Sequence, residues 1–147
     1  MRRPPRDPRS RVVTGWMWFD VAYVGAIMAV GTLLVMDGAL PGGLLPGAGD
    51  MPYARTLAFT TLVLFQLFNV FNARSDERSA FHDLFSNRWL WLAVLLSLSL
   101  QVAVVYLPFL QAPFGTVPLA PADWAVCFAV ASGVLWLREL VKVIARR

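Results

Sequence analysis

The chain has 147 residues, of which 58% are hydrophobic and only 15% are charged. This composition excludes an ordinary small soluble domain, in which about half of the residues are apolar and about a quarter are charged. The net charge of +4 does not indicate a nucleic-acid partner because the basic residues flank apolar runs, and the lone Cys127 and lone His82 provide neither a disulfide framework nor a metal-ligand cluster.

Residues 1–15 form a basic tail that is predicted to be irregular. Three prolines fall in its first eight residues, and proline lacks the N–H group and disfavours helical geometry in the residue before it. The tail carries five arginines: Arg2, Arg3, Arg6, Arg9 and Arg11. A solvated tail that sets topology and touches anionic headgroups is the favoured interpretation. A cytoplasmic docking segment is the alternative.

The first apolar run, residues 16–36, is predicted to be a membrane-spanning helix. Its length meets the roughly 20 predominantly apolar residues that a bilayer requires, and Asp20 interrupts it only near its start, where an interfacial position is expected. A secretory signal peptide is the rival interpretation. The run exceeds the usual apolar length of about 7–15 residues for such peptides, and no A-x-A-like cleavage site follows.

The second run, residues 53–73, carries three amides in its later half: Gln66, Asn69 and Asn72. On a helix this spacing places them within a sector of roughly 120°, so they share a face. Packing against neighbouring helices, with hydrogen bonds across the interface, is favoured. An ion path is the alternative, because amide oxygens are ligands for hard cations and polar groups at membrane depth often line pathways. Gln66 lies deepest, whereas Asn72 is a helix-exit group.

The third run, residues 89–107, is predicted to span the membrane and contains Ser97, Ser99 and Gln101 as its polar residues. Hydrogen bonds within the helix or between helices are expected to satisfy these groups.

The fourth run is predicted to form a helix over residues 122–144. Asp123 lies at its start, near the positive end of the helix dipole, and Cys127 is expected to be a small packing residue. The run is long enough to span only if it continues through Arg138 and Lys142, which are expected to form a solvated cytoplasmic helix end.

The distribution of Lys and Arg predicts the orientation. Four spans place twelve of the thirteen basic residues on one side, and only Arg55 on the other. By the positive-inside rule that side is cytoplasmic. The sequence therefore predicts an all-α integral membrane protein of the cell membrane, with four transmembrane helices and both termini in the cytoplasm.

Four segments also carry recognisable motifs in a fixed order. They read "RPPRDP" before a Gly-Trp, "FQLFNVFN", "NRWLWL" followed by "VYLPFLQAPFGTVPL", and "RELVK". Together they resemble the C-terminal membrane domain, helices seven to ten, of P-type cation-transporting ATPases of the calcium-pump type. The resemblance covers almost the whole chain and implies a single four-helix domain over residues 1–147.

The resemblance distinguishes the three amides. In animal calcium pumps the position matching Gln66 is a calcium-binding glutamate, and in sodium/potassium pumps the position matching Asn69 is an ion-site aspartate. The resemblance thus implies Gln66 and Asn69 as peripheral cation-binding candidates with uncharged ligands, and Asn72 as a helix-exit polar residue. The first acid of the tenth-helix "DE" pair is replaced by Arg138, so any role of that acid does not carry over.

The family's catalytic motifs, DKTGT, TGES and GDG-x-ND, do not occur in this sequence. The family uses ATP and magnesium, but this chain alone is expected to be non-catalytic and to hold no cofactor. The expected role is a C-terminal piece of a pump that supports the transport helices, with the lipid bilayer and the remainder of the pump as partners. The alternatives are an independent small membrane protein, acting as a dimeric cation channel or exchanger, and a non-functional pump remnant.

Overall fold

The computed structural model describes residues 15–43, 49–74 and 88–145, and the regular structure within them is entirely helical. The helices are α1 (Gly15–Ala39), α2 (Met51–Arg74), α3 (Arg88–Tyr106), α4 (Pro108–Phe114) and α5 (Pro121–Ala145). Of these, α1, α2, α3 and α5 are long and apolar enough to cross a membrane. The predicted all-helical, four-span architecture is therefore confirmed for the described residues, whereas the arginines of the basic tail and His82 lie outside them.

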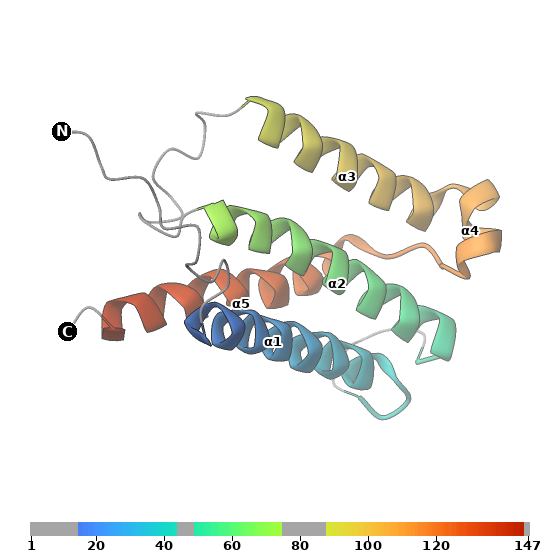
Figure 1. Ribbon diagram of the computed structural model, residues 1–147. Helices are drawn as coiled ribbons and strands as arrows, with labels where there is room; N and C mark the ends of the chain where they lie inside the picture. The colour runs from blue at the N-terminus through green and yellow to red at the C-terminus, as the bar shows by residue number, and fades with distance from the viewer. Residues whose placement is uncertain (1–14, 44–48, 75–87, 146–147) are drawn as a thin grey trace.

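The long helices run alternately up and down, so that α1 begins and α5 ends at the same end of the bundle (Figure 1). Side-chain caps help to fix where two of them start. The Asp50 carboxylate accepts the Tyr53 N–H group at 3.0 Å at the start of α2, and the Asp123 carboxylate accepts the Ala120 N–H group at 2.9 Å at the start of α5. Such caps satisfy N–H groups that have no partner within the helix.

The short helix α4 forms in a proline-containing segment between two of the spanning helices. The prolines of this segment indicate a turn-rich loop, yet Pro108 occupies the first turn, where its missing N–H group costs nothing. The helix ends at Gly115, whose φ of 64° is the left-handed geometry that glycine adopts without a steric penalty. The Gln111 side chain also donates to the Val105 carbonyl at 2.6 Å, which fastens α4 to the end of α3.

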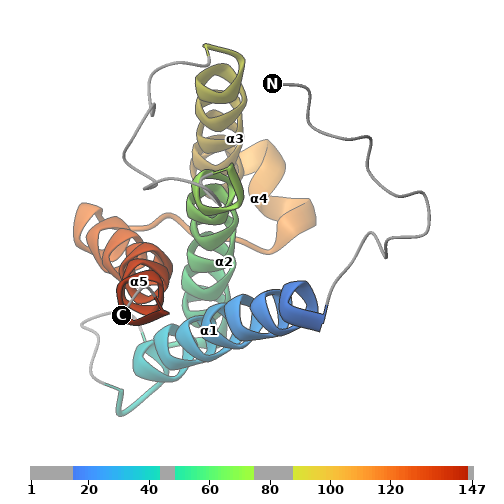
Figure 2. The same cartoon turned by 60° about the vertical axis from the view of Figure 1, so that its left-hand side comes forward.

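Helix α2 is the centre of the bundle. It lies between α3 on one side and α1 with α5 on the other in both views (Figures 1 and 2). In its most apolar stretch 44% of the residues are buried, against 17% in α1 and α3 and 22% in α5. The outer helices therefore expose large apolar side chains, as helices that face lipid tails do.

The apolar core lies where α1, α2 and α5 meet. Phe65 of α2 is 1% exposed and packs against the backbone of α1 at Gly31, where an added Cβ atom would lie 2.6 Å from the Phe65 ring. Cys127 is fully buried near the Leu57 carbonyl, as expected for a small packing residue. Small residues at membrane helix interfaces permit this close approach of backbones.

Buried polar contacts join α2 to its neighbours. The Gln101 side chain of α3 donates to the Thr60 hydroxyl at 2.9 Å, and the Tyr53 hydroxyl donates to the Asp123 carboxylate of α5 at 2.5 Å. Within α3, the Ser99 hydroxyl bonds the carbonyl of the preceding turn at 2.8 Å. The sequence predicted that the polar residues of this run form hydrogen bonds between helices or within their own helix. This prediction is confirmed for Gln101, which bonds another helix, and for Ser99, which bonds its own.

Candidate functional site

Gln66 and Asn69 line one pocket between α1, α2 and α5, here named the amide pocket. It has a volume of about 370 Å³, and its other polar lining residues are Asp20 and Arg138. The rest of the lining is apolar or glycine and comes from α1. The three-residue spacing of the amides thus brings both side chains to the same pocket, as the helical period predicts.

The two amides differ in exposure. Gln66 is exposed and Asn69 is half-buried, so both remain accessible from within the pocket. Asn72 lies two residues before the end of α2 at Arg74. The structure therefore brings Gln66 and Asn69 together in the amide pocket, and the side chain of Asn72 lies outside its described part.

An ion pair closes one side of the amide pocket. The Arg138 guanidinium of α5 donates to the Asp20 carboxylate of α1. The arginine side chain is 9% exposed, whereas the aspartate side chain is 48% exposed. The pair therefore joins α1 to α5, and it places an almost fully buried positive charge in the pocket that the amides line.

This arrangement corrects the expectation that Arg138 belongs to a solvated helix end. The residue is buried, with only 8% of its surface exposed. The physical reason is the convergence of α1 and α5, which places Asp20 opposite the guanidinium. Pairing and hydrogen bonding offset the cost of removing an arginine from water. Sequence reasoning missed the pair because the two residues are 118 positions apart.

The chemistry of the amide pocket is that of oxygen ligands beside a neutralised carboxylate. Amide carbonyl oxygens suit hard cations such as Ca²⁺, and carboxylates set much of the affinity of such sites. Among the described residues that line the pocket, Asp20 supplies the carboxylate, and this carboxylate is paired with the guanidinium of Arg138. The pocket thus contains oxygen atoms that could bind a cation, together with a guanidinium that already balances the charge of the carboxylate.

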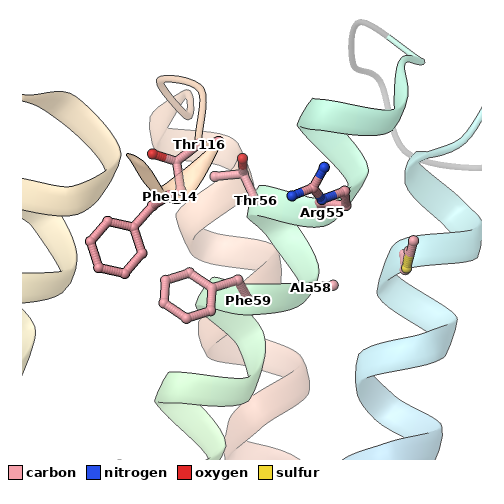
Figure 3. A pocket seen from close by; sticks show the side chains of 8 residues that line it. Arg55, Thr56, Ala58, Phe59, Phe114 and Thr116 are labelled. Atoms are coloured by element: carbon pink, nitrogen blue, oxygen red, sulfur yellow. The ribbon is translucent and has the colours of Figure 1, made fainter. Parts of the chain in front are cut away.

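A second pocket lies at the opposite end of α2, here named the Arg55 pocket (Figure 3). It has a volume of about 280 Å³ and lies between the start of α2 and the segment that follows α4. The Phe59 and Phe114 rings stack on its wall with centroids 6.5 Å apart. Arg55 is exposed, and Gly115 leaves room for its guanidinium, which would lie 3.3 Å from a Cβ atom at that position. No sequence-predicted site residue lines this pocket.

Comparison with known families gives one match that covers nearly the whole chain. Residues 1–144 match the family described as "Cation transporting ATPase, C-terminus". The match includes every helix described above except the last residue of α5.

Individual relatives are similar over the same length. The chain is 37% identical over 137 residues to the "Probable cation-transporting ATPase F" of Mycobacterium tuberculosis, with 91% of this chain and 14% of the relative covered. It is 34% identical over 132 residues to the "Calcium-transporting ATPase" of Bacillus subtilis, with 90% and 14% covered. It is 31% identical over 147 residues to the human "Calcium-transporting ATPase type 2C member 1", with 99% and 16% covered. The chain therefore spans about one seventh of the length of these relatives.

Proposed function

Because this chain belongs to the C-terminal family of cation-transporting P-type ATPases, we propose that it supports the transport helices of such a pump by assembling beside them in the membrane. The observation that carries the proposal is the family match over residues 1–144 together with four helices that can span a bilayer. The names of the relatives make calcium the leading cation for the assembled pump. ATP and Mg²⁺ would be bound by the remainder of the pump.

The exposed apolar surface supports an assembling role. Trp18 and Phe19 of α1 are 67% and 65% exposed, and Trp89 and Leu96 of α3 are 79% and 60% exposed. Lipid covers such side chains, and so do neighbouring helices of a larger membrane protein. Helices α1 and α3 lie on opposite sides of α2 (Figure 2), so the domain offers two separate faces to further helices.

We further propose that both termini lie in the cytoplasm. Helix α1 begins and α5 ends at one end of the bundle, which also holds the start of α3 at Arg88 (Figure 1). Arg55 lies at the other end. This arrangement agrees with the asymmetry of Lys and Arg on which the orientation rests. The basic tail, with its five arginines, would then face the cytoplasmic domains of the pump.

The role of Gln66 and Asn69 as ligands of the transported cation stays a prediction. Their convergence on the amide pocket supports it, and the guanidinium of Arg138 in the same pocket opposes it.

Assembly is tested by co-expression. The Bacillus subtilis relative is truncated so that it lacks the segment matched by this chain, and the two pieces are produced together in one membrane. We expect the tagged truncated relative to retain this chain through detergent purification. The control is an unrelated four-span membrane protein carrying the same tag. Recovery of this chain at no more than the level seen with the control would contradict the proposed function.

A further inference from the structure

The amide pocket already contains a positive charge. The Arg138 guanidinium lines the pocket from α5, is almost fully buried and is paired with Asp20 of α1. The guanidinium is a cationic group that is covalently part of the chain. The two residues predicted to bind a cation, Gln66 and Asn69, therefore share their pocket with a cationic side chain that cannot leave.

Calcium binding needs negative charge as well as oxygen atoms. Ca²⁺ takes six to eight oxygen ligands, and its affinity follows the number of charged ligands and the rigidity of the site. Gln66 and Asn69 offer neutral oxygens, and the Asp20 carboxylate is neutralised by the guanidinium. The ion pair carries no net charge, so the pocket offers a divalent ion neutral oxygens without the net negative charge on which its affinity depends.

We propose that Arg138 is the resident cation of the amide pocket and that, by holding Asp20, it prevents a transported cation from binding to Gln66 and Asn69. The two amides then line a pocket in which the charges of Asp20 and Arg138 already balance each other without a bound ion. This inference rests on the proposed function only in naming the excluded ion, since the pocket and its ion pair belong to this chain alone.

The inference is tested by measuring calcium binding to the full chain. The purified chain is placed in nanodiscs of zwitterionic lipid, so that anionic headgroups do not bind the ion, and the retention of ⁴⁵Ca²⁺ is measured. Four forms are compared: the wild type, Arg138→Gln, the double variant Asp20→Asn with Arg138→Gln, and Arg55→Gln as a matched control. The control makes the same chemical change at the other end of the bundle.

We expect the wild type and Arg55→Gln to bind no more calcium than empty nanodiscs. Arg138→Gln frees the Asp20 carboxylate beside two amides and should bind calcium with a dissociation constant of roughly 1 mM, because a single charged ligand gives a weak site. The double variant should return to the wild-type level. Circular dichroism and gel filtration check that each form is folded, and Arg138→Met, which keeps most of the side-chain volume, replaces Arg138→Gln if that variant unfolds.

Two results would overturn the inference. One is stoichiometric calcium binding by the wild type that is lowered in an additional variant, Gln66→Leu. The other is a folded Arg138→Gln variant, or its methionine substitute, that binds no more calcium than the wild type. Neither result depends on a partner, so this experiment can fail while co-purification with the truncated relative succeeds, and the reverse also holds.

Discussion

Reversing the charges of the Asp20–Arg138 pair should separate the contribution of the pair from that of either residue. The arginine side chain is 9% exposed and the aspartate side chain is 48% exposed, so the pair is neither fully buried nor a surface pair. Removing one partner of a buried pair costs about 3–5 kcal/mol, whereas an exposed pair contributes at most about 1 kcal/mol. Each single reversal, Asp20→Arg or Arg138→Asp, also places two like charges opposite each other. For this intermediate burial we expect either one to lower the free energy of unfolding by at least about 2 kcal/mol, or roughly 30-fold in the folded population.

The double variant, Asp20→Arg with Arg138→Asp, restores opposite charges across the same two helices. It should recover at least half of the loss, which a double-mutant cycle on the unfolding free energy would measure as a coupling between the two positions. The assay is reversible unfolding in mixed micelles with increasing denaturing detergent, followed by far-UV circular dichroism. If the losses in unfolding free energy of the two single variants simply add in the double variant, the two residues act independently. That result would refute the inference that the ion pair stabilises the contact between α1 and α5.

Two further substitutions test the packing of α2 against its neighbours. Gln101→Leu leaves the buried Thr60 hydroxyl without its hydrogen-bond donor. It should lower the free energy of unfolding by about 1 kcal/mol, in line with other interhelical polar contacts in membranes. Hydrogen exchange should show faster opening of α3, and an unchanged exchange rate would contradict this role. Gly31→Leu places a side chain where a Cβ atom already meets the Phe65 ring at 2.6 Å, so overpacking should cost about 1–3 kcal/mol in the same unfolding assay. Gly133→Leu is its control, because a Cβ atom there has open space; equal losses in the two variants would contradict the packing argument.

The four spans were predictable from the sequence because each depends on local information. Length and apolar composition determine whether a helix can cross a bilayer, and the predicted ends differ from the observed ones by at most three residues. The shared face of Gln66 and Asn69 is likewise local, since helical periodicity alone brings both side chains to the amide pocket. The short helix α4 escaped prediction because Pro108 and Pro113 read as helix breakers. At the first turn, however, a proline is compatible with a helix, and Pro113 falls only one residue before the helix ends at Phe114.

The contacts between helices were less predictable, because they depend on how each helix is rotated about its axis. The local sequence around Asp20 and around Arg138 predicts only that each residue lies near a membrane interface. It does not show that the two side chains face one another. The Tyr53–Asp123 hydrogen bond has the same origin, since it joins the starts of α2 and α5 across 70 positions. Burial of Arg138 is therefore a tertiary property that a pattern of apolar residues cannot reveal.

Transport by a chimera would show whether this chain can serve as the C-terminal membrane domain of a pump. In the Bacillus subtilis relative, the segment matched over 132 residues is replaced by this chain, and ATP-dependent ⁴⁵Ca²⁺ uptake is measured in sealed membrane vesicles. If this chain is a pump's C-terminal membrane domain, the chimera should take up calcium at a measurable fraction of the parent rate, and Asp20→Arg should lower that fraction. A chimera that is inserted and present at parental levels but shows no ATP-dependent uptake would contradict the account.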